Sequence, residues 1–194
     1  MRIEEKKKYQ KLVIIGASAG GINAVRQVVS RLPKNFPAPI VVIQHMNSFM
    51  NMFFIDFLNS HSSLHVKEVN HMELLLPGRI YYAPPNYHAL LEGGRVLLNA
   101  DQKVNYSRPS IDVFFESAAF EEKENLIGVI LTGANRDGSY GMNLIKACGG
   151  TCVIQDPETA ESQEMPRSAQ KNIEAEKVFA LEDIAAELIN LTND

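Results

Sequence analysis

Three residues, Ser18, His45 and Asp137, have the side chains needed for nucleophilic acyl transfer. Each lies at or after the end of an apolar run that is typical of a buried strand. A serine hydroxyl is a weak nucleophile unless a base lies within hydrogen-bond reach and an orienting group holds that base. Because the carboxyl ends of neighbouring parallel strands lie about 5 Å apart, we expect the three side chains to meet as nucleophile, base and orienting acid.

Ser18 lies at the centre of a small-residue turn, Gly16-Ala17-Ser18-Ala19-Gly20-Gly21. A dinucleotide-binding turn needs glycine where Ser18 stands and an acid at the end of the next strand, which here ends Ile43-Gln44-His45. The turn instead fits the G-x-S-x-G pattern of a nucleophile, with the N-terminus of the following helix near the oxyanion. Taken alone, the turn favours a helix-capping serine. The presence of His45 and Asp137 favours the nucleophile.

The order of these residues along the chain is Ser, His, Asp. The α/β-hydrolases use the order Ser, Asp or Glu, His, and their serine does not follow the first strand of the chain. An ordinary α/β-hydrolase is therefore excluded. Taken singly, His45 fits a structural strand-end residue, and Asp137 fits the N-cap of the helix that follows it.

The elements that would position these residues alternate between strands and helices. Apolar runs predict strands at 12–16, 39–45, 65–69, 126–131 and 151–155, and helical patterns predict helices at 21–32, 50–60, 112–122, 138–148 and 182–191. This alternation predicts an α/β fold with a doubly wound, mostly parallel sheet and helices on both faces. Short alternating strands at 76–100, with a turn at Glu92-Gly93-Gly94-Arg95, predict a small antiparallel hairpin insertion. Ser110 is expected to cap the helix at 112–122.

The composition limits the classes of function. The chain has 194 residues and a net charge of −4, so we expect no binding to nucleic acid or to an anionic membrane surface. No apolar run reaches the length of a membrane span, and the N-terminus lacks the apolar core of a signal peptide. Cys148 and Cys152 lack a second pair that would complete a zinc site, and we interpret them as reduced thiols of a cytoplasmic protein. Acyl transfer by a serine, a histidine and an aspartate requires no metal or organic cofactor, so none is expected. In line with this, His61, His65 and His71 show no metal-ligand spacing.

Six longer stretches of the chain match the pattern of one enzyme family. They are VIIGASAGG, VVIQHM, LPGRIYYAPPNYH, RPSIDVFFESAA, VILTGANRDGSYGM and IQDPETAESQEMPRSA. From about residue 10 to residue 190 the chain thereby resembles the catalytic domain of the CheB-type protein-glutamate methylesterases. The resemblance implies hydrolysis of γ-glutamyl methyl esters on chemoreceptor helices and deamidation of certain receptor glutamines. It places the family's catalytic serine, histidine and aspartate at Ser18, His45 and Asp137.

The turn Leu131-Thr132-Gly133-Ala134-Asn135-Arg136-Asp137-Gly138 departs from the family's usual L-T-G-M-G-x-D-G. Ala134 replaces a methionine whose backbone amide is implicated in the oxyanion site. The resemblance therefore implies oxyanion donors at the N–H groups of Ala19 and Ala134. Ala19 stands where the family often has threonine. Asn135 replaces a glycine, and asparagine is among the best-tolerated substitutes where φ must be positive.

Methylated chemoreceptor helices are the implied partner, and a methyltransferase is a further candidate. Arg108 and Arg136 border the expected cleft, where they either steer acidic receptor helices or are simply solvated. Together with Met46 they are the candidate substrate-binding residues. We interpret the apolar cluster after His45 as core rather than as a helix-docking surface. Its members are Met46, Met50, Met52, Phe53 and Phe54.

Residues 1–10 are expected to form a Lys-rich N-terminal arm, and residues 11–194 a single catalytic domain. Many members of the family carry an N-terminal receiver domain, for which this chain has no room, so we expect no phosphorylation control in cis. Two other functions stay open. One is a catalytically weak module that docks a receptor or a methyltransferase, which the three triad-type residues disfavour. The other is an esterase that acts outside chemotaxis, which the missing receiver domain favours.

Overall fold

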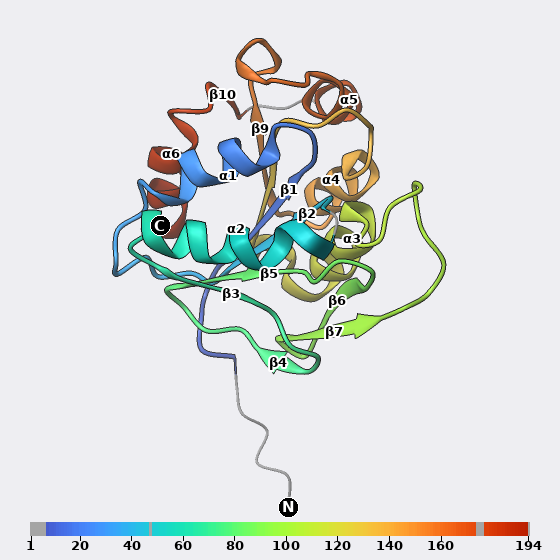
Figure 1. Cartoon of the computed structure of the whole chain (residues 1–194). Coiled ribbons are helices and arrows are strands. Elements are labelled where there is room, and N and C mark those ends of the chain that lie inside the picture. The colour runs from blue at the N-terminus through green and yellow to red at the C-terminus, as the bar shows by residue number, and fades with distance from the viewer. Residues whose placement is uncertain (1–6, 47, 174–176, 194) are drawn as a thin grey trace, which may run out of the picture.

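The structure is a computed structural model that describes residues 7–46, 48–173 and 177–193, without the side chains of residues 48–52 and of Asn172. A seven-stranded sheet forms its centre (Figure 1). The strands are β1 (Leu12–Ala17), β2 (Ile40–Gln44), β3 (His65–Glu68), β5 (Arg79–Tyr82), β8 (Leu126–Ile130), β9 (Thr151–Gln155) and β10 (Val178–Phe179). They lie in the order β10-β9-β8-β1-β2-β5-β3, and every neighbouring pair is parallel. The prediction of a parallel sheet is confirmed.

Helices cover both faces of this sheet. On one face pack α1 (Gly21–Val29), α2 (Ser48–His61) and α6 (Ile184–Asn193), and on the other α3 (Ile111–Glu122), α4 (Ser139–Ala147) and α5 (Glu164–Asn172). Because side chains alternate along a strand, β1 sends Leu12 and Ile14 to the α3 side and Val13 and Ile15 to the α1 side. The central strands are therefore buried on both faces, which explains their continuous apolar runs. The doubly wound arrangement is confirmed.

A second sheet holds β4 (Glu73–Leu74), β7 (Arg95–Asn99) and β6 (His88–Glu92) in that order, with antiparallel pairing. β6 and β7 form the expected hairpin, which turns at Gly93 and Gly94 with φ of 58° and 70°. The assignment of β5 to this insertion is wrong, because β5 pairs in parallel with β2 and β3. Its residues Ile80, Tyr81 and Tyr82 are fully buried, as in a strand covered on both faces.

One predicted helix ends earlier than expected, and one helix of the structure is not predicted by the sequence. α1 ends at Val29 rather than at residue 32, and Leu32 is buried in the turn that follows. α5 has no counterpart in the sequence analysis, because few of its residues are apolar and it contains Pro166. Pro166 lies in the first turn of the helix, where an N–H group has no intrahelical acceptor to lose. No helix within the described ranges is long and apolar enough to cross a membrane.

The N-terminal segment contacts α3 through the buried side chain of Glu122. The Tyr9 hydroxyl donates to Glu122 Oε1 at 2.9 Å, and the Lys7 ammonium forms an ion pair with Glu122 Oε2. Burial, together with the nearby carboxylate, raises the pKa of Tyr9. A carboxylate removed from water needs such partners, so residues 7–9 cover the end of α3.

Candidate active site

The carboxyl ends of β8, β1 and β2 lie side by side at the centre of the sheet. The register pairs Gly16 with Ile43 on one side and with Ile130 on the other, so the segments leaving these strands start at one level. The chain leaves β1 toward α1 and β8 toward α4, and these helices lie on opposite faces. Such a divergence forms the crevice in which doubly wound proteins bind ligands.

Ser18, His45 and Asp137 are linked by hydrogen bonds at this crevice. His45 Nδ1 lies 3.1 Å from Ser18 Oγ, and His45 Nε2 lies 2.9 Å from Asp137 Oδ2. An ionised carboxylate only accepts hydrogen bonds, so the Nε2–H of His45 donates to Asp137. The lone pair of Nδ1 then faces the Ser18 hydroxyl, as a general base requires. The structure thus brings together the three residues that the sequence pattern groups.

Neighbouring strand ends fix the backbone of Ser18. Its N–H donates to the Thr132 carbonyl at 3.0 Å, and its carbonyl accepts from Gln44 Nε2 at 2.8 Å. A Cβ on Gly21 would lie 2.4 Å from Gln44 Oε1, so glycine is needed where the helix passes Gln44. The N-cap of α1 is Gly20, at φ 76°, and no side chain caps the helix. The capping role that the turn favours on its own is therefore not the role of Ser18.

Asp137 is fully buried and accepts hydrogen bonds from five groups. The donors are His45 Nε2, Asn105 Nδ2, Ser110 Oγ and the backbone N–H groups of Ile111 and Asp112. Burial alone would raise the pKa of this carboxyl, but the hydrogen bonds outweigh burial and lower the pKa to about 2. Asp137 is therefore ionised at neutral pH and can stabilise an imidazolium at His45.

Asp137 also caps a helix that is distant in sequence. The N–H of Ile111, the first residue of α3, donates to Asp137 Oδ2 at 2.8 Å, and that of Asp112 donates to Oδ1 at 3.1 Å. Ser110 occupies the N-cap position, as expected, but its hydroxyl donates to Asp137 at 2.9 Å and does not cap the helix. The interpretation of Asp137 as the cap of α4 is wrong, because Gly138 is the N-cap there. The positive end of the α3 dipole thus faces the Asp137 carboxylate.

Asn105 has no clear signal in the sequence, although it contacts the triad acid. Its Nδ2 donates to Asp137 Oδ1 at 2.9 Å and to Asp112 Oδ2 at 2.8 Å. The backbone of Asn105 is left-handed at φ 51°, a conformation that asparagine tolerates better than most residues. A turn-favouring asparagine in a loop is too common to identify such a contact from the sequence.

His88, to which we assign no chemistry from the sequence, supports the start of α3. It is buried, its Nδ1 accepts from the Ser110 N–H at 3.2 Å, and its Nε2 donates to the Gln102 carbonyl at 2.9 Å. His88 therefore holds the loop before α3 in place. Across the described parts of the chain, no group of three or more His, Cys, Asp or Glu side chains is arranged to hold a metal ion.

Asp112 is a second buried carboxylate beside Asp137. Its Oδ1 accepts from the Gly141 N–H at 2.8 Å, and its Oδ2 accepts from Asn105. Burial raises the pKa of Asp112 to about 6, the Gly141 hydrogen bond opposes this shift, and the charge of Asp137 adds to it. The two carboxylates that share Asn105 thus titrate far apart.

The backbone of Asn135 is not left-handed. A need for positive φ therefore does not explain why asparagine stands here in place of glycine. Instead its side chain takes part in the site. Asn135 Oδ1 accepts from the Asp137 N–H at 3.0 Å. This bond fixes the orientation of the amide, so that Nδ2 faces His45 Nδ1 at 3.5 Å.

The N–H groups of Ala19 and Ala134, the expected oxyanion donors, lie on exposed turns after β1 and β8. Thr132 joins the two turns, because its Oγ1 donates to the Ala19 carbonyl at 2.9 Å and its own carbonyl accepts from Ser18. Neither N–H group has a hydrogen-bond acceptor among the residues that the structure describes. Both groups are therefore open to a ligand.

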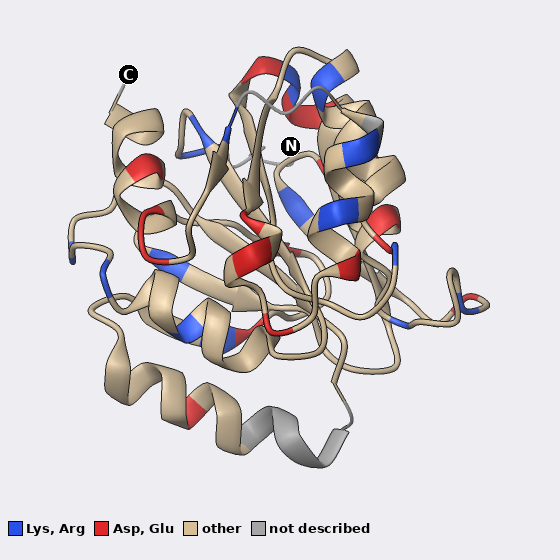
Figure 2. Ribbon diagram, turned by 90° about the horizontal axis from the view of Figure 1, so that it is seen from above, with Lys and Arg blue, Asp and Glu red and all other residues tan. Residues whose placement is uncertain are grey.

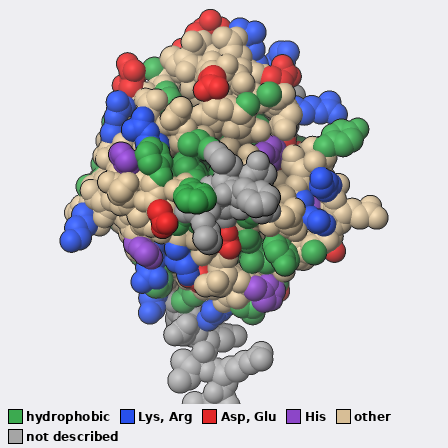
Figure 3. All heavy atoms as spheres, in the orientation of Figure 1, with side chains coloured by type: hydrophobic (Ala, Val, Ile, Leu, Met, Phe, Trp, Pro, Cys, Tyr) green, Lys and Arg blue, Asp and Glu red, His purple; other side chains and the backbone are tan. Residues whose placement is uncertain are grey.

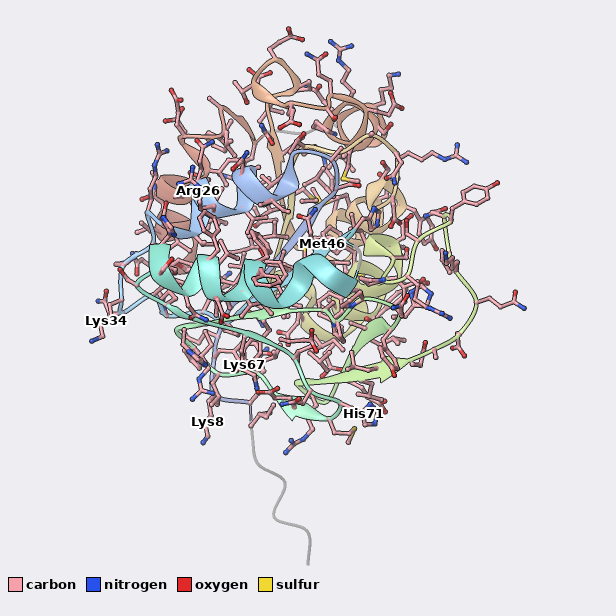
Figure 4. The ribbon with its side chains drawn as sticks, viewed as in Figure 1. Lys8, Arg26, Lys34, Met46, Lys67 and His71 are labelled. Carbon is pink, nitrogen blue, oxygen red and sulfur yellow. The ribbon has the colours of Figure 1, made fainter. Side chains whose placement is uncertain are left out.

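A cavity of about 330 Å³ opens beside His45. It is lined by His45, Met46, Asn86, Lys103, Tyr106, Ser107, Arg108 and Pro109. Two candidate substrate-binding residues, Met46 and Arg108, thus border the cavity of the triad histidine, and Met46 lies near the N-terminal end of α2 (Figure 4). The third candidate, Arg136, lines a different cavity of about 350 Å³ that also contains Asp112.

The apolar cluster on α2 divides between core and surface. Phe54 is 4% exposed and packs edge-on against Tyr82, with ring centroids 5.4 Å apart. Phe53 is 81% exposed, and Figure 3 shows hydrophobic side chains gathered on this face. The interpretation as core is confirmed for Phe54 and wrong for Phe53. The side chains of Met50 and Met52 lie outside the described residues.

The Asp112 carboxyl makes the free energy of unfolding depend on pH. Because its pKa rises from 3.8 to about 6 on folding, its contribution to stability is complete below the lower value and is lost as pH rises through the higher one. Relative to the wild type, we expect the free energy of unfolding of Asp112→Asn to rise by roughly 2–3 kcal/mol between about pH 4 and pH 7. Urea unfolding of both proteins across this range measures the gain. A difference that does not vary with pH contradicts the assignment, and the exposed Asp56→Asn serves as the control.

The chain matches the model of the CheB methylesterase family over residues 13–188. A relative from Leptospira interrogans is 44% identical over 180 residues, which cover 92% of this chain and 93% of the relative. The protein-glutamate methylesterase/protein-glutamine glutaminase of Thermotoga maritima is 39% identical over 185 residues, which cover 93% of this chain and 54% of the relative. The chain spans about half the length of this relative and of the one from Pseudomonas putida, which is 38% identical over 186 residues.

Among solved structures, the Thermotoga maritima CheB methylesterase catalytic domain has the same fold. It superposes with a TM-score of 0.89 at 38% sequence identity, covering 93% of this chain and 98% of the other. Family match, sequence identity and fold agree over almost the whole described chain. This chain therefore belongs to the CheB methylesterase family.

Proposed function

We propose that this protein is a serine hydrolase that removes methyl esters from glutamate side chains of chemoreceptor-type signalling proteins. Deamidation of receptor glutamines is the second reaction in this proposal. The observation that carries it is the series of contacts from Ser18 Oγ through both ring nitrogens of His45 to the buried Asp137. The names of the Thermotoga maritima and Pseudomonas putida relatives support glutamyl esters and amides as the substrates.

The first half of the reaction forms an acyl-enzyme. His45 Nδ1 takes the proton of Ser18 as Oγ attacks the ester carbonyl, and Asp137 stabilises the imidazolium that results. His45 then gives this proton to the leaving methanol, or to ammonia when the substrate is glutamine. In the second half, His45 deprotonates a water that attacks the acyl-serine. Ser18 is regenerated and a glutamate carboxylate leaves.

Charge on the substrate oxygen is stabilised in this proposal by the N–H groups of Ala19 and Ala134, which have no acceptor among the described residues. Asn135 adds a third donor. While His45 is neutral, the Asn135 amide faces the Nδ1 lone pair at 3.5 Å. When Nδ1 gains the Ser18 proton, that lone pair disappears, and the amide becomes available to the oxyanion at the moment its charge develops.

The proposal includes a cytoplasmic location and helical receptor partners. Cys148 and Cys152 are both free thiols, which fits a reducing compartment. A methylated receptor helix is the substrate and the principal partner, and the methyltransferase that makes this substrate is a further candidate. Met46 and Arg108 are the substrate-binding residues, since both line the cavity of His45.

Two other functions are alternatives to the proposed one. A docking module without catalysis would not need an ionised Asp137 held by five donors, so this arrangement favours an enzyme. An esterase acting outside chemotaxis would use the same triad on another ester. Only turnover of methylated receptor distinguishes it from the proposed methylesterase.

Replacing the nucleophile tests the proposal directly. We expect Ser18→Ala to lower methanol release from a methylated receptor fragment by about 10⁴-fold or more, because the acyl-enzyme cannot form. Gas chromatography or a coupled alcohol oxidase assay measures the methanol. Ser30→Ala, at the other end of α1, is the matched control and is expected to retain wild-type turnover. Turnover that survives in Ser18→Ala removes Ser18 from the mechanism, and receptor binding without any wild-type turnover favours the docking module.

Asn135 is tested by a variant that keeps the local turn. Asn135→Ser retains an oxygen that can accept from the Asp137 N–H but lacks the amide donor. We expect kcat to fall about tenfold with KM within about twofold, because the donor acts mainly in the transition state. Steady-state kinetics on the receptor fragment measure both constants. Asn23→Ser, on the exposed side of α1, is the control. An unchanged kcat would exclude a catalytic contribution from the amide.

A further inference from the structure

The cavity beside His45 has a positive character. Lys103 and Arg108 are among its lining residues and no carboxylate is, although the chain as a whole has a net charge of −4. The neighbouring cavity around Arg136 differs, because Asp112 lines it as well. Unbalanced positive charge in a concave site raises the local concentration of anionic groups. The cavity of the triad histidine therefore favours an anion.

Arg108 is oriented but not neutralised. Its Nη1 donates to the carbonyls of Ala100 and Asp101, each at 2.7 Å. Its Nε is buried without a hydrogen-bond partner. Among the described residues, no carboxylate forms an ion pair with it. A guanidinium whose direction is set by the backbone, and which lacks a counter-ion, is preorganised to bind a carboxylate.

The loop that carries Arg108 is fixed relative to the triad. It joins β7 to α3 and projects from the body of the molecule (Figure 1), with both basic and acidic positions along it (Figure 2). Asn105 and Tyr106 are both left-handed, at φ 51° and 62°. This turn directs Asn105 onto Asp137 and leaves Tyr106 97% exposed. The turn thus presents an aromatic side chain to a partner that approaches this loop.

We propose that this cavity is an anion subsite for a carboxylate side chain that neighbours the methyl-ester glutamate on the substrate helix. Arg108 forms the ion pair, Lys103 adds to the positive field, and Tyr106 packs against the helix. The inference rests on the proposed function, since it takes a helical protein as substrate. The ester itself is neutral, so the charge of Arg108 selects an acidic residue within one helical turn of it. Esterification or amidation of that neighbour removes its charge and slows hydrolysis at the first site.

The test compares receptor fragments that differ in one charge. Each fragment carries a single methyl-ester glutamate, with every acidic residue within one turn changed to glutamine, and glutamate is then restored at one position at a time. Dissociation constants are measured with the Ser18→Ala protein, and kcat/KM with the wild type. We expect glutamate in at least one position to tighten binding and to raise kcat/KM about tenfold.

Variants of Arg108 distinguish binding of a carboxylate from stabilisation of the loop by the hydrogen bonds of Arg108 to Ala100 and Asp101. Arg108→Gln in the Ser18→Ala protein is expected to bring the ratio of the two dissociation constants, neutral over acidic, to about one. If Arg108 only stabilises the loop, loss of its hydrogen bonds weakens binding of both fragments equally and leaves the ratio unchanged. Lys103→Gln, which leaves the hydrogen bonds of Arg108 in place, is expected to reduce the ratio about twofold. Arg136→Gln is expected to preserve it, because Arg136 lines the other cavity.

The outcomes distinguish this inference from the function on which it rests. A ratio near one in the Ser18→Ala protein, or a ratio that persists in Arg108→Gln, overturns the anion subsite. A ratio of about ten that disappears in Arg108→Gln supports the subsite even when the wild type hydrolyses none of the fragments. That last result would contradict the proposed methylesterase activity alone.

Discussion

The structure of the site depends on one buried negative charge. Asp137 is fully excluded from solvent, and an ionised carboxylate in such a place is very unfavourable unless hydrogen bonds replace its water. Its five donors come from the segment after β2, the loop before α3 and the first turn of α3. Each of these segments must therefore be in place before the carboxylate is stable. Meeting this requirement also orients His45 for proton transfer.

The glycines around the site serve the same requirement. A Cβ on Gly16 would lie 2.6 Å from Ile111 Cγ2, and one on Gly138 would lie 2.7 Å from the same atom. Ile111 begins α3, and its N–H donates to Asp137. A side chain at either glycine would therefore push the start of α3 away from the carboxylate that caps it. The small residues of the first turn thus act beyond Ser18, because they let a helix from the opposite face approach β1.

The sequence predicts the parts of the molecule that depend on regular patterns. The parallel sheet, the helices on both faces and the meeting of Ser18, His45 and Asp137 follow from apolar runs and from the polar residues that end them. The prediction is wrong where the sheet to which a strand belongs depends on its pairing partners. β5 is such a strand, because its short apolar run resembles those of the hairpin strands that follow it, yet it pairs with β2 and β3. Asn105 and Asn135 are missed as site residues because their contacts depend on how loops fold back. Local spacing carries no information about that path.

Asp112, in the first turn of α3, and Asp137, which contacts that turn, are two buried carboxylates that lie close together. Their hydrogen bonds explain how the structure accommodates both. Asn105 supplies one hydrogen bond to each carboxylate, but Asp137 has four further donors and Asp112 has one, the N–H of Gly141. The pKa of Asp137 accordingly falls to about 2 while that of Asp112 rises to about 6. The donors, rather than the residue type, decide which of the two acids stays ionised to lower pH. Because one of those donors is Asn105, the loop that lines the His45 cavity and the triad acid are held by the same contact.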